Sequence, residues 1–295
     1  MAEEEAYATV AAFRRALENR LRNRAQSEGL DLTRLYRMVA FERFLGRVCA
    51  DDPPMWLLKG GYAMEVRLRM EARATKDVDL SLPDGSLITT EGQADVDRLL
   101  ERLRIVVARD LRDGFVFKIG DPIRDVMAAP YGGWRFQVES RLADRRFAEF
   151  KLDVGIGDAI VSAPEWMPGH DLLSFANIPP VRIALLPREQ HFAEKIHAYT
   201  VPREATNSRV RDLVDLVLLI QKGLPETATV ARAVDATFIR RKTHAVPAVL
   251  PAPPVDWAVP YQKIADEVGV VPAEIRAAFE IVREYWTGIK FEGKE

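Results

Sequence analysis

The N-terminal part of the chain has apolar residues at helical spacing. This spacing runs from Ala11 to Ala50, and "SEGLDL" interrupts it as a turn, so the pattern predicts two helices. "DDPP" then ends the second helix, because proline cannot continue a helix and disfavours helical geometry in the residue before it. "MWLLK" follows as a short apolar run, which predicts a buried strand.

The middle of the chain changes to mixed spacing. "YAMEVRL" has helical character, "KDVDLSL" alternates polar and apolar residues as a half-buried strand does, and "PDGS" predicts the turn that closes this strand. A helix is expected from about Gln93 to Arg109, and strands at "GFVFKIG", "WRFQVESRL" and "AEFKLDVGI". This order predicts an α+β fold, in which helices flank an antiparallel or mixed sheet.

The C-terminal part has helical spacing only. Helices are expected at "REQHFAEKIHAYTV", "SRVRDLVDLVLLIQ" and "ATVARAVDATFIRR", and a last one from about Pro272 to Gly288. The proline-rich "AVPAVLPAPPVDWAVP" predicts a stiff, extended connector between helices. A domain boundary within residues 160–187 therefore divides the chain into residues 1–186, with the sheet and the N-terminal helices, and residues 187–295, a helical C-terminal domain.

The composition is that of an ordinary globular protein. Hydrophobic residues make up 48% and charged residues 29% of the 295 positions, which excludes disordered and fibrous classes. The start "MAEEEAYATV" is acidic, unlike a secretory signal, and no uninterrupted apolar run of about 18 residues predicts a membrane span. We therefore expect a cytoplasmic protein without a membrane partner.

A single cysteine, Cys49, provides no disulfide framework and no zinc signature, so Cys49 is expected to be a buried small hydrophobe.

The charge is unevenly distributed, although the formal net charge is only -2. Between Arg14 and Lys76 there are fourteen Lys or Arg against eight Asp or Glu, an excess of 14 - 8 = +6. Such an excess could bind phosphates. Solvated helix faces with ion pairs explain it equally well.

Two aspartates lie close together in the predicted strand "KDVDLSL". Asp77 and Asp79 are two residues apart, so both side chains leave the sheet on the same face. Their charges repel unless a cation neutralises them, and oxygen ligands favour Mg²⁺ or Mn²⁺. Upstream, Gly60 and Gly61 follow a strand and open a helix, where bare backbone can approach a phosphate. The alternatives are two solvent-facing aspartates at a strand end and an ordinary glycine turn.

A third carboxylate interrupts the apolar pattern of "FKLDVGIGD". An acid at Asp153 needs a partner, and if its strand lies beside that of Asp79, three carboxylates converge as two-metal nucleotidyl transfer requires. The third acid could then orient or deprotonate an attacking hydroxyl. Asp158 has the opposite strand parity and is expected in a turn.

The helical half contains a second charged group. Lys195 lies between apolar neighbours, and "RVRDLVDL" places Arg209, Arg211, Asp212 and Asp215 within two helical turns. A lysine in a cleft could neutralise triphosphate charge, with an acid holding it in place. Interhelical salt bridges are the alternative.

Five segments in this order resemble the AbiEii/AbiGii toxin family of nucleotidyltransferases, which includes the mycobacterial MenT toxins. The segments are "LLKGGYAMEVRL", "ATKDVDL", "FKLDVGI", "AEKIHAY" and "RVRDLVDLVLL", and the resemblance covers approximately residues 17–222. It implies a DNA polymerase beta-like nucleotidyltransferase core, a mixed sheet flanked by helices, followed by a helical C-terminal domain.

The resemblance also implies roles for individual residues. Those implied for catalysis are Asp77, Asp79, Asp153, Lys195 and Asp215, of which Asp77, Asp79 and Asp153 would also bind metal. Those implied for nucleotide binding are Gly60, Gly61, Thr75, Lys76, Lys195, Arg209 and Asp212. Thr75 matches a hydroxyl residue that can accept phosphate in some members. This chain has GG where some relatives have GS or GGS, which leaves the choice of nucleotide open.

In function, the resemblance implies a toxin of a toxin-antitoxin or phage-defence system. It would use Mg²⁺ or Mn²⁺ to move NMP from an NTP to an acceptor, the 3′ end of tRNA, and so block translation, with its antitoxin encoded upstream. Two alternatives stay open: transfer to a small molecule or a protein hydroxyl, and a non-catalytic module that binds RNA or an antitoxin. The resemblance assigns no role to residues 222–295.

Overall fold

The structure is a computed structural model that describes residues 7–83, 93–125, 129–202 and 209–291. Its contacts divide the chain into two compact units. The sheet unit contains Met1–Val66, Ala74–Gly157 and Trp166–Leu185, and the helical unit contains Arg67–Arg73, Asp158–Glu165 and Leu186–Glu295. The two units therefore interleave along the chain, while the single boundary expected at residue 186 stays a prediction.

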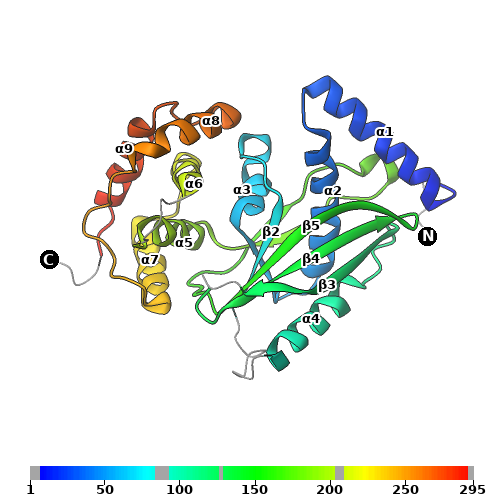
Figure 1. Cartoon of the computed structure of the whole chain (residues 1–295), viewed down its shortest axis with the longest axis horizontal. Helices are drawn as coiled ribbons and strands as arrows, with labels where there is room; N and C mark the ends of the chain where they lie inside the picture. Colours follow the sequence, from blue (N-terminus) through cyan, green and yellow to red (C-terminus); the bar gives the residue numbers. More distant parts are fainter. Residues whose placement is uncertain (1–6, 84–92, 126–128, 203–208, 292–295) are drawn as a thin grey trace. The chain divides into compact units, whose positions relative to one another are not determined.

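The sheet unit is built on one mixed sheet of seven strands, in the order β3-β4-β5-β2-β1-β7-β6. Figure 1 labels four of these strands, β3, β4, β5 and β2. The strands are β1 (Leu57–Lys59), β2 (Asp77–Leu82), β3 (Phe115–Asp125), β4 (Gly133–Leu142), β5 (Arg145–Ile156), β6 (Glu165–Pro168) and β7 (Arg182–Leu185). β2 runs parallel to β5 and antiparallel to β1, which confirms the predicted mixed sheet. The predicted turn "PDGS" extends into residues 84–86, outside the described part of the chain.

Four helices belong wholly or mainly to the sheet unit: α1 (Val10–Glu28), α2 (Leu32–Val48), α3 (Gly60–Leu68) and α4 (Gln93–Val107). Local capping sets the ends of the first two. The Thr9 hydroxyl accepts a hydrogen bond from the Ala12 amide at the start of α1, and Gly29 ends α1 in the left-handed conformation. The Asp31 carboxylate then accepts from the Thr33 amide at the start of α2. The two predicted N-terminal helices are therefore confirmed.

Apolar and polar residues alternate along the strands, which gives the sheet one apolar and one polar face. α2 packs on β5 and β7, and α4 packs on β3 and α2. Phe150 of β5 meets Phe41 and Phe44 of α2 edge to face, with ring centroids 4.9 and 5.5 Å apart. From Phe150 to the end of β5, odd-numbered residues, including Asp153, consequently point to the opposite face.

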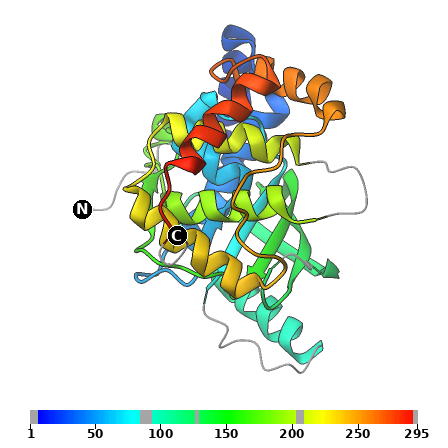
Figure 2. The same ribbon diagram turned by 90° about the vertical axis from the view of Figure 1, so that its left-hand side faces the viewer.

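The helical unit contains α5 (Arg188–Thr200), α6 (Val210–Gln221), α7 (Thr227–Arg241), α8 (Ala258–Val268) and α9 (Ile275–Thr287). α5 packs against α6 and α7, and α6 packs against α8 and α9, as Figure 2 shows from the side of these helices. The helices predicted from "REQHFAEKIHAYTV", "SRVRDLVDLVLLIQ" and "ATVARAVDATFIRR" are confirmed, except that Ser208 lies outside the described residues.

The short strands β6 and β7, which lie within residues 160–187, were not predicted from the sequence. One prediction about an element was wrong. The proline-rich segment is not extended to its end, because it includes a 3₁₀ turn at Val255–Trp257 and the first turn of α8. Pro260 fits in this first helical turn, where its missing N–H would have no helical partner.

Candidate active site

A row of charged residues crosses the polar face of the sheet. In the parallel pair β2 and β5, Asp79 lies opposite Asp153. Arg135 of β4 lies opposite Asp153 on its other side, and Lys59 of β1 lies opposite Asp79. The order across four neighbouring strands is therefore Lys59, Asp79, Asp153, Arg135. The sheet thus brings the two aspartates that the sequence singled out into adjacent positions.

Asp77 belongs to the same face, one step along β2. It is two residues from Asp79, so their side chains leave the strand in the same direction, and both residues are half-buried. Lys151 of β5, an exposed residue, lies opposite Asp77. Three carboxylates and three cationic residues therefore share this part of the face.

Gly60 and Asp79 are in direct contact. Gly60 has a φ of +66°, and a Cβ built on it would lie 2.1 Å from Oδ2 of Asp79. A side chain at Gly60 would therefore be strained by the backbone and would also collide with the carboxylate. α3 begins at this glycine, and Gly61 is buried in its first turn. The glycines and the aspartate pair consequently form one local structure.

Asp153 is held by Arg135. Nε and a terminal nitrogen of the guanidinium donate to Oδ1 and Oδ2 of Asp153, each at 2.5 Å. These hydrogen bonds raise the pKa of Arg135, and the charges of Asp153, Asp77 and Asp79 raise it further. The sequence reasoning did not identify Arg135. The parity of "WRFQVESRL" places Arg135 on the polar face, but the strand pairing that puts it beside Asp153 is not visible in one sequence.

The donor set of Asp77 and Asp79 fits one hard divalent cation. Carboxylate oxygens are the ligands that Mg²⁺ prefers, and Mg²⁺ needs only one or two carboxylates when a nucleotide supplies further oxygens. Within the described residues, no three His, Cys, Asp or Glu side chains form a group that could hold a metal ion. The fit of Asp77 and Asp79 to the cation rests on their donor chemistry, and Asp153 as a third ligand stays a prediction.

Thr75 and Lys76 precede the aspartate pair. The Thr75 hydroxyl donates to the backbone oxygen of Asp77 at 3.4 Å, and Lys76 is exposed. Asp158, the acid after β5, lies in irregular structure, whereas the sequence predicted a turn. It is buried, and Arg241 donates to it at 2.8 Å. The nucleotide-binding roles of Thr75, Lys76, Gly60 and Gly61 stay predictions.

The helical unit contains the second predicted group as a buried charge cluster. Lys195 of α5 donates to Asp212 and Asp215 of α6, each at 2.7 Å. Arg73 donates to both oxygens of Asp215, at 3.1 and 3.0 Å, and Arg209 reaches Asp212 at 3.5 Å. The interhelical salt bridges that were the alternative interpretation are therefore present.

Mutual attraction dominates the electrostatics of this cluster. Burial alone would lower the pKa of Lys195, but the charges of Asp212 and Asp215 outweigh it and raise that pKa above its usual value. Burial alone would raise the pKa of Asp215, but Arg73 and Lys195 hold it well below its usual range. Lys195 and Asp215 are therefore ionised at neutral pH. The catalytic and nucleotide-binding roles of Lys195, Asp215, Asp212 and Arg209 stay predictions.

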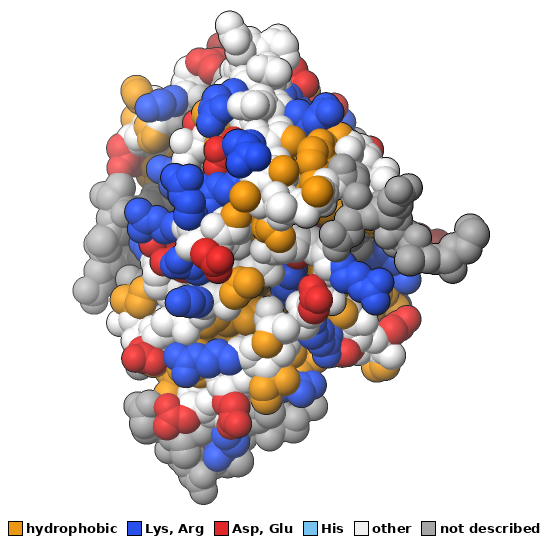
Figure 3. Space-filling model, turned by 90° about the vertical axis from the view of Figure 1, so that its right-hand side faces the viewer, with side chains coloured by type: hydrophobic (Ala, Val, Ile, Leu, Met, Phe, Trp, Pro, Cys, Tyr) orange, Lys and Arg blue, Asp and Glu red, His pale blue; other side chains and the backbone are white. Residues whose placement is uncertain are grey.

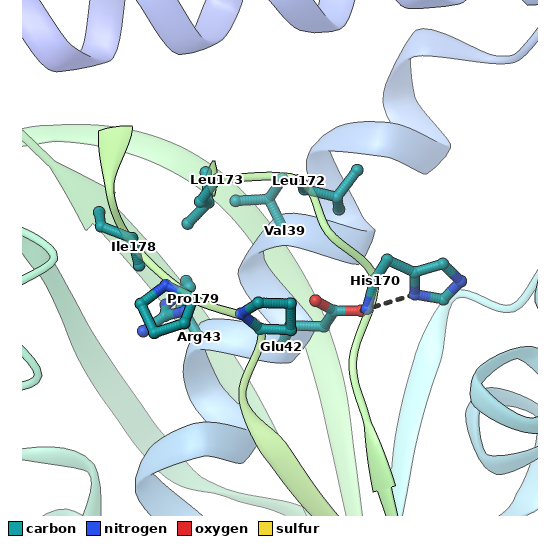
Figure 4. A pocket seen from close by; sticks show the side chains of 9 residues that line it. Val39, Glu42, Arg43, His170, Leu172, Leu173, Ile178 and Pro179 are labelled. Carbon is teal, nitrogen blue, oxygen red and sulfur yellow. Dashed lines mark hydrogen bonds and ion pairs between the residues drawn. The ribbon is translucent and has the colours of Figure 1, made fainter. Parts of the chain in front are cut away.

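A pocket of the sheet unit lies apart from this set of residues. Figure 4 shows Val39, Glu42 and Arg43 of α2 facing the segment from His170 to Pro180. Glu42 accepts hydrogen bonds from the His170 amide at 2.6 Å and from the Tyr62 hydroxyl at 3.3 Å, and it lies 2.6 Å from Nδ1 of His170. Because Tyr62 follows Gly61, this carboxylate anchors the first turn of α3. None of the predicted site residues lines the pocket.

The basic excess near the N-terminus is largely used in ion pairs. Arg14 pairs with Glu18, Arg24 with Glu28 and Arg34 with Glu65, at 2.7, 3.1 and 2.8 Å. Lys and Arg side chains gather on part of the surface in Figure 3, with acidic side chains among them. The ion-pair interpretation of this excess therefore has structural support.

The geometry of the fold and the site can be compared with that of known protein families. A mixed sheet with paired aspartates beside a glycine turn is an arrangement expected of a nucleotidyltransferase. The model of the family "Nucleotidyl transferase AbiEii toxin, Type IV TA system" matches residues 43–289, so the chain belongs to that family of nucleotidyltransferase toxins. The match extends past residue 222, where the recognisable motifs end. The family implies an NTP substrate and an antitoxin partner, and its members usually use a divalent metal.

Among solved structures, the fold is similar to that of MenT4, a nucleotidyltransferase toxin from Mycobacterium tuberculosis H37Rv. The TM-score is 0.52 at 14% identity, covering 94% of this chain and 100% of that one. A nucleotidyltransferase from H. pylori matches with a TM-score of 0.39 at 16% identity, covering 83% of this chain and 93% of that one. No curated protein matches the sequence. No helix in the described ranges is long and apolar enough to cross a membrane.

Proposed function

We propose that this chain moves NMP from an NTP to the 3′ end of a tRNA, with Mg²⁺ bound by Asp77 and Asp79, and thereby blocks translation. The contact between Gly60 and the Asp79 carboxylate is the observation that carries the proposal, because it puts a phosphate-accessible backbone turn beside a metal-binding acid. A cytoplasmic location, an upstream antitoxin gene and a role in phage defence belong to the same proposal.

The proposed reaction is a single in-line displacement. The acceptor hydroxyl gives its proton to Asp153 and its oxygen forms a bond to the α-phosphorus, while the bond from that phosphorus to the bridging oxygen breaks and pyrophosphate leaves. A divalent ion would neutralise phosphate charge at the reacting centre. Asp77 and Asp79 would hold it, the Gly60 turn would accommodate the phosphates, and Asp153 would orient the attacking hydroxyl. Lys195, Arg209, Asp212 and Asp215 belong to the other unit, so their proposed roles rest on the family resemblance.

The direct test is transfer of label from each α-labelled NTP to total tRNA in the presence of Mg²⁺. We expect Asp79→Asn to reduce labelling on the order of a thousandfold, since a metal ligand contributes several kcal/mol to stabilising the transition state. Asp121→Asn is the matched control, because Asp121 is an exposed acid of β3 whose side chain is 88% accessible.

Three outcomes would contradict parts of this proposal. Equal labelling by wild type and Asp79→Asn would overturn the metal site. Label on an added protein or small molecule, but never on RNA, would overturn the choice of acceptor. Absence of labelled product from any acceptor, together with RNA or antitoxin binding, would favour a non-catalytic module.

A further inference from the structure

The carboxylates of the candidate site already have cationic neighbours. Lys59 lies opposite Asp79, Lys151 opposite Asp77, and Arg135 opposite Asp153. The formal charges of these six residues cancel. One divalent ion would therefore give this part of the sheet a net positive charge, which opposes the entry of a second ion.

Arg135 is in direct hydrogen-bond contact with the carboxylate that it faces. Its guanidinium binds both oxygens of Asp153, in the two-pronged geometry that gives arginine–carboxylate pairs their strength and fixed orientation. The side chains of Arg135 and Asp153 are only 20% and 15% exposed, so water screens the pair weakly. The negative charges of Asp77 and Asp79 also act on Arg135, which therefore belongs electrostatically to the whole carboxylate group.

We propose that Arg135 is a positioning residue that supplies the second cation of this site. Its guanidinium keeps Asp153 in place, so the chain binds a single divalent ion, at Asp77 and Asp79. This inference rests on the proposed function, since it assumes that these two aspartates bind the metal. It changes the expectation from the sequence, in which all three carboxylates bind metal.

Arg135 has a fixed charge. Its guanidinium therefore differs from a metal ion, which binds a carboxylate reversibly. Arginine stays protonated at any pH at which the protein is folded, so the cation beside Asp153 is permanent. A second divalent ion at Asp153 would have to displace the guanidinium and leave a half-buried arginine without its partner. Breaking a pair of this kind is strongly destabilising when it is buried, and less so where water can replace the partner.

The test counts the ions bound to the full chain, using Mn²⁺ alone as an EPR-visible probe. The EPR signal of free Mn²⁺, compared with the total added, gives the number of ions bound per chain. When two ions share one site, magnetic coupling between them broadens the signal of the bound ions. The chains compared are wild type, Arg135→Gln, Arg135→Lys, Asp79→Asn and Arg141→Gln. Arg141 is the matched control, because it lies on the same face of β4 but pairs with Glu139, at 2.7 Å.

We expect one Asp79-dependent ion in wild type, in Arg135→Lys and in Arg141→Gln. Removal of the charge in Arg135→Gln frees Asp153, so we expect a second ion and a broadened signal in that variant. Far-UV circular dichroism of each variant verifies folding, and Arg135→Lys shows whether charge, rather than the shape of arginine, limits the number of ions.

Two coupled ions in wild type would overturn the inference, and so would a single ion in a folded Arg135→Gln chain. These results leave the proposed function intact, provided that Asp79→Asn loses the ion. If instead Asp79→Asn binds Mn²⁺ as wild type does, the metal site fails and the proposed function fails with it. If wild type binds no Mn²⁺, the inference fails, and the labelling of tRNA decides the proposed function by itself.

Discussion

At the scale of single residues, Gly60 meets two requirements at once. It adopts the backbone conformation that the start of α3 needs, and it leaves space for the Asp79 carboxylate. Its φ of +66° favours glycine, and the Asp79 carboxylate occupies the space that a side chain would need. The sequence indicated that the glycines open a helix and that Asp79 lies in a strand. It could not show that they touch, because this contact depends on the antiparallel pairing of Lys59 with Asp79.

We predict that Gly60→Ala costs stability and displaces Asp79, whereas Gly29→Ala costs stability only. Both glycines have a φ of +66°, but a Cβ at Gly29 would meet nothing within 4 Å. Each substitution should lower the free energy of unfolding by about 1 kcal/mol through backbone strain. Only Gly60→Ala should also weaken Mn²⁺ binding and labelling of tRNA.

Urea unfolding and Mn²⁺ titration of both variants measure these two effects separately. Unchanged Mn²⁺ binding in a folded Gly60→Ala chain would show that the Asp79 carboxylate does not need its present position. An equal loss of binding in Gly29→Ala would show that the effect is not local.

At the scale of elements, each unit contains a buried carboxylate held by two cations. In the sheet unit, Arg43 and Arg47 of α2 donate to Asp113, just before β3, at 2.7 Å. In the helical unit, Arg73 and Lys195 hold Asp215. Both acids have fully buried side chains. The sequence analysis named salt bridges of Lys195 as an alternative, but it missed Arg43, Arg47 and Arg73, because these arginines are distant in sequence from the acids that they bind.

We predict that Asp113→Asn lowers the free energy of unfolding by about 3 kcal/mol at pH 7, because two buried guanidinium groups lose their partner charge. Burial alone would raise the pKa of Asp113, but Arg47 and Arg43 outweigh it and lower that pKa. The stabilisation is therefore complete above the unfolded-state pKa of about 3.9 and is lost as the pH falls toward the lower folded-state pKa. The difference between wild type and variant should narrow below about pH 4.

Urea unfolding at a series of pH values from 7 to 3 measures this difference, with the exposed Asp121→Asn as the control. A difference that widens on acidification would mean that the charge of Asp113 does not stabilise the fold.

The elements that could be predicted were those with a long local pattern. The helices and long strands have clear periodicity, whereas β6 and β7, with four residues each, are too short to show alternation. α8 was missed because the prolines before and within its first turn resemble a connector. Short strands form because a neighbouring strand is present to pair with them. This pairing is a tertiary contact, which the local sequence pattern does not show.

At the scale of the whole molecule, pairings between distant segments decide what the charged residues do. Asp79 and Asp153 are adjacent only because β2 pairs with β5 in one register, and a shift by one residue would point Asp153 to the apolar face. The order of motifs along the chain thus identified the acids and the family. It did not identify Arg135, whose position depends on the pairing of β4 with β5.

The division into two compact units makes a prediction about local opening. Removing the charge of Asp113 should loosen α2 and β3, while Asp215→Asn should loosen α5 and α6, because each acid bonds to elements of its own unit. Hydrogen exchange read by mass spectrometry, peptide by peptide, measures both variants against wild type. We expect faster exchange in the affected unit and near wild-type exchange in the other. An equal acceleration across both units in either variant would mean that the two cores open as a single cooperative structure, in which case neither carboxylate acts locally.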